Sequence, residues 1–463
     1  MSGKHMEPIK FKALLSAVII ASGALMMLAL GTGVAATPYQ SQGLAIDFGD
    51  RDVIWTDFDL HGVNDPVDLL ISVCEENGFD YEITTNRTVA KIRDAESDNE
   101  RWWDFWVINK GEKTWTKLYP PYDTKLLDHT SCAWAYCSES EKPTVGADQS
   151  GNSIFGYARP ERVISLSPSI TEMVGSLNAV STLVGTDRYS NYPNSVVQAQ
   201  LRGDITIVGD WVSPSYETIM GTNPDMVFCD GSQYSHHIMS ERLRKADVRA
   251  VVLYPGESIE VIIDNIYIIG VTLEYEQRAQ SVISMLEYVQ DYLLAKLMSE
   301  GTDFISTMFA LSPDKSPWVA GRYTYIDDIS AAVFGENSMP NSFYGWVHVS
   351  SEIIAFVRPS VIIIVTEEYG ATPYEYGEML SMLSAEWKST PAYNDADPQN
   401  SQIYMLCGDL AEMAMRPGPR YAQLMELIAM ILHPEAFGQE LPRFIGSDYE
   451  SHLTITKDYG FNS

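Results

Sequence analysis

The strongest constraint on the fold of this chain is an internal repeat, in which two stretches share the same spacing of tryptophan, glutamate and proline. The three residues are Trp211, Glu217 and Pro224 in the first stretch, and Trp346, Glu352 and Pro359 in the second. In both, the glutamate follows the tryptophan by six positions and the proline by thirteen, and a short apolar run comes next. The pattern predicts a tryptophan in a loop, a short helix opened by the glutamate and ended by the proline, and a buried strand. A unit used twice favours two similar lobes with a ligand between the two tryptophans, and two unrelated core tryptophans are the alternative.

The composition indicates a soluble chain of two or three domains. Its 463 residues are enough for several separate cores. The 62 acidic residues against 31 basic ones give a formal net charge of −31. So large a negative charge opposes contact with phosphate backbones and with an anionic membrane surface, and we therefore expect no nucleic-acid partner.

The N-terminus has the pattern of an export signal or a membrane anchor over residues 1–36. Lysines precede an uncharged, mostly apolar stretch at 13–30, and the small residues Val34 and Ala36 fit cleavage before Thr37. The stretch is also just long enough to span a bilayer if it is not cleaved, and a buried helix is the remaining alternative. We expect an exported protein at the outer face of the cytoplasmic membrane, either secreted or held by this helix.

The cysteines indicate at most one short disulfide and no metal site. In an exported chain, Cys132 and Cys137 could close a small loop, and the odd total of five leaves at least one thiol unpaired. Neither cysteine has the histidine or cysteine neighbours that a zinc site needs.

Three regions follow the N-terminal segment. Residues 41–137 contain aromatic-rich strands and one helix near Pro66, which predicts a small α+β, β-grasp-like domain. Residues 138–157 are polar and lack periodicity, as in a linker.

Residues 158–463 alternate strand and helix patterns, which predicts an α/β fold of two Rossmann-like lobes. The first lobe covers about 158–270 and the second about 302–463. Apolar residues at helical spacing predict one long, rigid helix over about 274–298 between the lobes.

Several motifs of this last region occur in a fixed order. They are the run from Arg162 to Glu172, Tyr189-Ser190-Asn191-Tyr192-Pro193, Asn223-Pro224-Asp225, Trp318-Val319-Ala320-Gly321, Gly335-Glu336-Asn337 and Arg416-Pro417-Gly418-Pro419-Arg420. With these motifs, residues 158–434 resemble the class III substrate-binding proteins of ABC importers, and most of all the members that bind cobalamin. The resemblance implies a monomer that carries a small molecule to a permease and ATPase complex, and it implies no catalytic cofactor.

The resemblance also implies which residues line the cleft. The positions that match the family's aromatic cleft residues are Tyr189, Trp211 and Trp346, and Asp230 stands about where the cobalamin-binding members have a further aromatic. One glutamate per lobe docks to permease arginines in the family, and Glu217 and Glu352 match those positions.

The N-terminal region resembles the transcobalamin-like domain more loosely. Such a domain contacts the vitamin in transcobalamin, which favours a corrinoid as the ligand. A module that faces the cell wall or binds a partner is the alternative.

The chemistry of the residues suits a large flat ligand. Wide aromatic faces can enclose the disc of a corrin or a porphyrin. Arg416 could pair with ligand carboxylates or with the acidic surface, and His236 and His237, expected in a polar loop, could offer an axial nitrogen to a metal or remain solvated. No catalytic motif is recognisable, so we expect no enzyme. The sequence leaves open a corrinoid, haem or a ferric siderophore as the ligand, and also a surface sensor or adhesion role.

Overall fold

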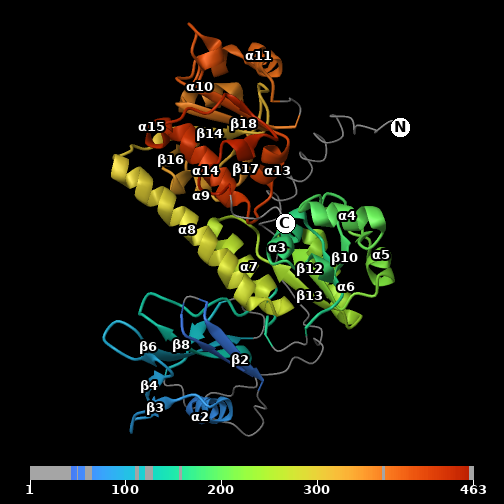
Figure 1. Ribbon diagram of the computed structural model, residues 1–463, viewed down its shortest axis with the longest axis vertical. Helices are drawn as coiled ribbons and strands as arrows, with labels where there is room; N and C mark the ends of the chain where they lie inside the picture. Colours follow the sequence, from blue (N-terminus) through green and yellow to red (C-terminus); the bar gives the residue numbers. More distant parts are fainter. Residues whose placement is uncertain are drawn as a thin grey trace.

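The computed structural model describes most of the chain after residue 42. The described residues are 43–49, 51–57, 65–109, 114–119, 129–155, 159–367 and 371–457. Three bodies follow one another along the longest axis, with the N-terminal domain at one end, lobe one in the middle and lobe two at the other end (Figure 1). The apolar stretch expected at 13–30 lies outside the described residues, and no helix within them is long and apolar enough to cross a membrane.

Lobe one is a parallel sheet with the strand order β11-β10-β9-β12-β13. Its strands are β9 (Val163–Ser165), β10 (Leu183–Thr186), β11 (Thr206–Ile207), β12 (Met226–Asp230) and β13 (Arg249–Leu253). Its helices are α3 (Pro168–Ser176), α4 (Asn194–Arg202), α5 (Tyr216–Gly221), α6 (Tyr234–Lys245) and α7 (Ile259–Leu273). Strands β9, β12 and β13 are apolar and mostly buried along their length, as expected for a parallel sheet covered on both faces.

The long helix predicted between the lobes is confirmed as α8 (Glu276–Glu300). Its buried side chains recur at helical spacing from Ala279 to Leu297, so one stripe of the helix packs on the core. Gly301 ends it in the left-handed conformation, with φ of 65°. In Figure 1 the helix runs diagonally from lobe one to the left edge of lobe two, where it ends beside α15.

Lobe two is a second α/β unit, and the predicted α/β fold class is confirmed. Its sheet has the order β17-β15-β14-β18-β19-β20, with β16 paired to β14. The strands are β14 (Ile305–Ala310), β15 (Trp318–Ala320), β16 (Gly335–Asn337), β17 (Trp346–His348), β18 (Val361–Thr366), β19 (Ile403–Cys407) and β20 (Phe444–Ile445). The helices are α9 (Tyr325–Ala332), α10 (Ser351–Val357), α11 (Pro373–Met382), α12 (Ala385–Lys388), α13 (Asp409–Met415), α14 (Tyr421–Leu432) and α15 (Pro434–Phe437).

The N-terminal domain contains a mixed sheet in the order β2-β1-β8-β6-β7 and a small sheet in the order β3-β4-β5. Its elements are β1 (Gly43–Asp47), β2 (Val53–Asp57), α2 (Pro66–Asn77), β3 (Tyr81–Ile83), β4 (Val89–Ile92), β5 (Ala95–Glu96), β6 (Trp102–Asn109), β7 (Thr116–Lys117) and β8 (His129–Cys137). The central strands β1 and β8 are parallel, and the other pairs are antiparallel. This is the α+β arrangement expected, and its kinship with transcobalamin stays a prediction.

The predicted disulfide between Cys132 and Cys137 is wrong. Both residues belong to β8, and five residues of extended strand span about 16 Å, whereas disulfide-bonded Cα atoms lie roughly 4.4–6.8 Å apart. An odd separation also turns the two side chains to opposite faces of the sheet. Cys132 accordingly packs in the core under α2, and Cys137 packs in the core shared with lobe one.

The segment expected to be a linker is instead packed on lobe one. The buried carboxylate of Asp148 accepts the N–H of Val252 at 3.0 Å and pairs with Arg244 at 3.1 Å. Phe155 stacks on Trp55 of β2 with ring centroids 4.9 Å apart, and Arg51 reaches Glu287 on α8 at 2.9 Å. The N-terminal domain is therefore held against lobe one, at the end remote from lobe two (Figure 1).

Candidate ligand-binding cleft

The first tryptophan unit forms as the spacing predicts. Trp211 lies in a bend after β11, Glu217 is in the first turn of α5, and the strand after Pro224 is the buried β12. The indole Nε1 of Trp211 donates to Asp230 Oδ2 at 3.0 Å. Asp230 therefore orients the half-buried tryptophan from the carboxyl end of β12, which is the edge where α/β sheets bind ligands.

The histidines next to this unit are structural. His236 is buried in the first turn of α6, where its Nδ1 accepts the N–H of Asp230 at 2.9 Å. Its Nε2, 2.7 Å from the carbonyl oxygen of Trp211, must therefore carry the proton. Burial lowers the pKa of the imidazole, although Asp230 opposes this.

The expectation of a polar loop is thus wrong, because His236 and His237 both lie in α6. The possibility that His236 is an axial ligand fails as well, because neither of its ring nitrogens has a free lone pair. His237 also lies in α6, with Nε2 3.0 Å from the carbonyl oxygen of Gly231. For His237 both alternatives named from the sequence, an axial contact with a metal and a solvated side chain, stay open. No group of three or more potential metal ligands is found among the described residues.

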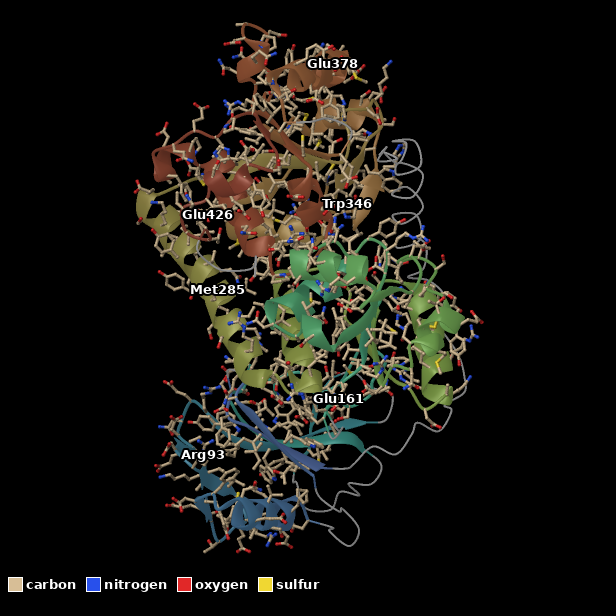
Figure 2. All side chains as sticks on the ribbon, turned by 45° about the vertical axis from the view of Figure 1, so that its right-hand side comes forward. Arg93, Glu161, Met285, Trp346, Glu378 and Glu426 are labelled. Atoms are coloured by element: carbon tan, nitrogen blue, oxygen red, sulfur yellow. The ribbon has the colours of Figure 1, made fainter. Side chains whose placement is uncertain are left out.

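The second tryptophan unit differs from the first at its start. Trp346 begins strand β17 and pairs with Ala320 of β15, so the prediction of a loop is wrong at this position. The rest of the unit agrees, with Glu352 in the first turn of α10 and β18 fully buried after Pro359. Trp346 is half-buried and lies where lobe two meets lobe one (Figure 2).

The loop after β10 brings Tyr189 beside the first unit. The N–H of Arg188 donates to the carbonyl oxygen of Gly209 at 2.9 Å, which joins this loop to the bend that carries Trp211. The carboxylate of Asp187 accepts the N–H of Tyr189 at 2.7 Å and the hydroxyl of Ser190. Burial raises the pKa of Asp187 to about 6 in spite of these hydrogen bonds.

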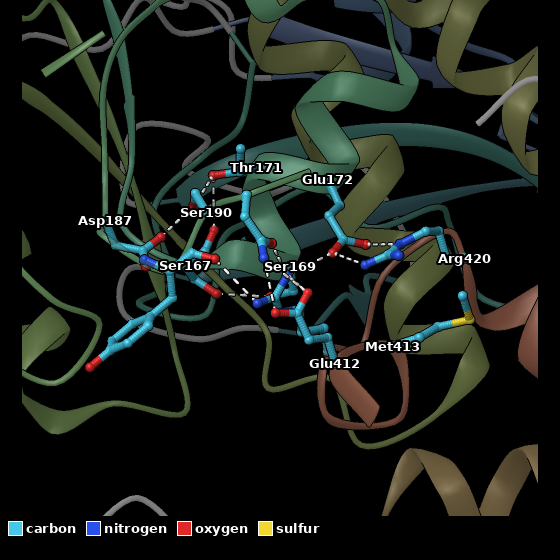
Figure 3. A network of polar contacts seen from close by, with 12 residues as sticks. Ser167, Ser169, Thr171, Glu172, Asp187, Ser190, Glu412, Met413 and Arg420 are labelled. Atoms are coloured by element: carbon cyan, nitrogen blue, oxygen red, sulfur yellow. Dashed lines mark hydrogen bonds and ion pairs between the residues drawn. The ribbon is translucent and has the colours of Figure 1, made fainter. Parts of the chain in front are cut away.

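A buried ionic network joins this loop to lobe two (Figure 3). The carboxylate of Glu172 on α3 accepts two hydrogen bonds from Arg420, at 2.6 and 2.9 Å, and both residues are 2% exposed. Burial favours the neutral form of Arg420, but the charge of Glu172 outweighs this and raises the pKa of the guanidinium.

Arg416, predicted as a ligand contact, belongs to the same network. It donates to Asn191 Oδ1 at 2.6 Å and to the carbonyl oxygen of Tyr189 at 3.2 Å. It also pairs with Glu412 at 3.1 Å and lies 3.5 Å from Glu172. In the structure its guanidinium positions the Tyr189 loop, and a contact with ligand stays a prediction.

A cavity of about 490 Å3 opens at the lobe boundary. It is lined by the two residues before α7, by the loops that follow β15 and precede β17, and by the first turn of α9: Glu257, Ser258, Arg322, Tyr323, Thr324, Asp327, Asp328, Asn341 and Tyr344. None of the five predicted ligand residues is among them. Trp346 stands two positions after Tyr344, so this wall adjoins the second tryptophan unit.

Two tyrosines on this wall escaped the sequence analysis. The rings of Tyr323 and Tyr344 stack 5.6 Å apart at 21°, and the residues are 71% and 61% exposed. The loop is fixed by its backbone, because the N–H of Gly321 donates to the carbonyl oxygen of Gly345 at 2.8 Å and a Cβ on Gly321 would lie 2.5 Å from the carbonyl oxygen of Phe343. In the sequence, the available signal for this pair of loops was Gly321, which belongs to a family motif. The tyrosines themselves gave no signal, since exposed loop residues follow no periodic pattern.

Two of the four charged groups in the cavity wall pair with each other, and a third binds a backbone N–H. Arg322 reaches Asp327 at 3.3 Å, and Asp328 accepts the N–H of Ile259 at the start of α7 at 2.8 Å. The residue Glu257 is exposed, and its carboxylate has no hydrogen-bond or ion-pair partner among the described residues. The protein around it still desolvates the carboxylate in part, which raises its pKa.

Residues 163–404 match the model of the protein family described as periplasmic binding protein. The chain belongs to this family.

Similar proteins include one that is named for no ligand and two that are named for different ligands. The chain is 22% identical to the uncharacterized ABC transporter substrate-binding lipoprotein YvrC of Bacillus subtilis over 297 residues, 64% of this chain and 87% of that protein. It is 22% identical to the vitamin B12-binding protein of Yersinia pestis over 223 residues, 44% of this chain and 69% of that protein. The periplasmic haem-binding protein BhuT with two haems shares the fold, with a TM-score of 0.50 and 17% identity over 60% of this chain and 100% of that one.

Proposed function

We propose that this chain is the extracytoplasmic substrate-binding component of an ABC importer and that it captures a corrinoid between its lobes. The observation that carries the proposal is the cavity at the lobe boundary, whose wall includes the stacked Tyr323 and Tyr344, the second of which stands two positions before Trp346. Tyr189 comes near the same boundary through its carbonyl oxygen, which accepts a hydrogen bond from Arg416 of lobe two. We propose that the Tyr189 and Trp211 side chains of lobe one face the same ligand. The relatives named as a substrate-binding lipoprotein and a vitamin B12-binding protein support it.

Aromatic walls suit a disc-shaped ligand for a physical reason. Each tryptophan or tyrosine can bury about 150–250 Å2, and at roughly 25 cal/mol per Å2 this is several kcal/mol before ordering costs. Three such side chains are enough for sub-micromolar binding.

Glu217 and Glu352 are proposed to dock to the permease. Each is exposed in the first turn of a short helix, one per lobe. A hydrogen bond with Ser350 lowers the pKa of Glu352, so this group stays charged near neutrality. Exposed charges of this kind contribute orientation and association rate rather than affinity.

A surface sensor or adhesion protein is the second candidate function. The N-terminal domain favours it, because α2, β3 and β4 lie at the end of the molecule remote from lobe two (Figures 1 and 2). From that place the domain is better suited to bind a partner than to cover a ligand between the lobes. Uptake of a corrinoid through a cognate permease would favour the importer.

Spectral titration with cobinamide, cobalamin, haemin and a ferric siderophore tests the proposed ligand. We expect one corrinoid per chain, and Trp211→Ala or Trp346→Ala should each cost roughly 2 kcal/mol of binding free energy, as truncated aromatic anchors do. Tyr374→Ala, on an exposed aromatic of α11, is the matched control and should bind normally. Binding of haemin or the siderophore alone would refute the corrinoid, and normal binding by both tryptophan variants would place the cleft elsewhere.

A further inference from the structure

The cavity at the lobe boundary has a charge pattern that limits what it can accept. It is polar and acidic around a stacked tyrosine pair, with the carboxylates of Glu257, Asp327 and Asp328 against one guanidinium, that of Arg322. The tyrosine rings offer apolar faces, whereas the groups around them can only hydrogen-bond or repel. The inference from this pattern rests on the proposed function, because it concerns the edge of the ligand held between the lobes.

Each source of positive charge in the cavity wall already faces an acceptor of the protein. Arg322 pairs with Asp327 at 3.3 Å and also donates to Asn341 Oδ1 at 3.1 Å. The start of α7 is satisfied by Asp328, and the start of α9 is capped by Thr324, whose hydroxyl accepts the N–H of Asp327 at 3.2 Å. A ligand carboxylate would therefore have to displace one of these internal acceptors.

The neighbouring arginines are also unavailable to a ligand carboxylate in the cavity. Arg420 is held by Glu172, and Arg416 is held by Glu412 and Asn191. Arg188 beside Tyr189 is exposed and has no carboxylate partner among the described residues, but it does not line the cavity. Carboxylate recognition commonly uses a bidentate arginine, and the cavity has no arginine to spare for it.

Glu257 adds a repulsive element. This residue is exposed at the lobe-one rim of the cavity, directly before the cap residue Ser258 of α7, and its carboxylate has no hydrogen-bond or ion-pair partner among the described residues. A second carboxylate placed here would meet a like charge, whereas a primary amide could donate its N–H to Glu257. Discrimination by an unpaired like charge is a common way to reject a close analogue.

We infer that this cavity is a subsite for an uncharged, amide-bearing edge of the ligand, and that Glu257 is the residue that rejects a carboxylate-bearing edge. The ligand class is thereby narrowed to amide-edged corrinoids. Porphyrins with free carboxylates and corrinoid acids are disfavoured at the same cleft.

The test compares two ligands that differ only in edge charge: cobinamide, and a corrinoid whose side-chain amides have been hydrolysed to carboxylates. Calorimetric titration of the wild-type protein at low salt should show at least a tenfold preference for cobinamide, which corresponds to about 1.4 kcal/mol. In Glu257→Gln the affinity for cobinamide should stay within about threefold of the wild-type affinity. The preference for cobinamide over the hydrolysed corrinoid should fall to about a third of the wild-type preference or less. Glu260→Gln removes the same charge from an equally exposed position on α7 that does not line the cavity, so it is the matched control and should leave the preference unchanged.

The outcomes separate this inference from the proposed function. Equal affinity of the wild-type protein for both corrinoids, or an unchanged preference in Glu257→Gln, would overturn the inference and leave corrinoid capture intact. Failure of both corrinoids together with tight binding of haemin would overturn the proposed ligand and the inference with it, since haemin carries free carboxylates.

Discussion

The lobe boundary has two parts that use the same kinds of side chain in opposite ways. In the first part, Glu172 and Arg420 form a dry ion pair, each 2% exposed. In the second part, Arg322 and Asp327 pair at the mouth of a cavity, beside tyrosines that are mostly exposed. The dry pair fixes the distance between the lobes, and the open part leaves room for a ligand. A boundary that is tied at one place and open at another suits a clamp with little closure, in line with the long α8.

The largest expected effect concerns the dry part. Glu172→Ala leaves the guanidinium of Arg420 buried without its partner, and breaking a buried pair in this way typically costs about 3–5 kcal/mol of the free energy of unfolding. Urea denaturation measures the loss. The matched control is Asp204→Ala, which breaks an exposed pair with Arg202 and should cost less than about 1 kcal/mol. Equal losses in the two variants would show that the Glu172 pair does not hold the lobes together.

The same contrast shows which features the sequence could reveal. Strands β12 and β18 and helix α8 were predictable, because buried parallel strands are apolar runs and a packed helix repeats its apolar residues. The ion pair was not, since Glu172 and Arg420 are far apart in the chain and both are unremarkable polar residues in isolation.

The site was predicted less completely than the fold. Trp346 was expected in a loop because it repeats the spacing of the Trp211 stretch. Strand β17 could not be recognised, since it is only three residues long and follows a glycine. Tyr323 and Tyr344 were missed because their stacking depends on the pairing of two loops, which no local pattern records. Arg416 was recognised from its motif, but its partners in lobe one depend on how the lobes dock.

A smaller loss of stability is expected at Asp187, the buried carboxylate of the same network that forms no ion pair with an arginine among the described residues (Figure 3). Burial raises the pKa of Asp187 from 3.8 to about 6, so the folded protein holds this proton more tightly than the unfolded chain. The contribution to stability is therefore present below about pH 4 and is lost as the pH rises through about 6, by roughly 2–3 kcal/mol.

Asp187→Asn tests this assignment, because the amide cannot ionise. The variant should gain stability relative to the wild-type protein on going from pH 4 to pH 7, as measured by urea denaturation at each pH. Asp204→Asn, at an exposed position, serves as the control and should show no such gain. A difference between Asp187→Asn and the wild-type protein that does not change with pH would mean that Asp187 is ionised throughout.

The smallest change in corrinoid affinity at the lobe boundary is expected from substitution of the two glutamates proposed to dock to the permease. Glu217→Lys combined with Glu352→Lys should leave corrinoid affinity nearly unchanged, because both side chains are exposed on α5 and α10 and contribute nothing to the cavity wall. Uptake through the cognate permease should nevertheless collapse, since the family resemblance sets each position against a permease arginine and like charges at an interface cost several kcal/mol.

Glu241→Lys with Glu378→Lys makes the same charge change at exposed positions on α6 and α11, and it should leave uptake intact. Permease arginines changed to glutamate should partly restore uptake by the first double variant. If that variant transports normally, the glutamates are ordinary first-turn carboxylates, and if it loses corrinoid binding, they belong to the open part of the boundary.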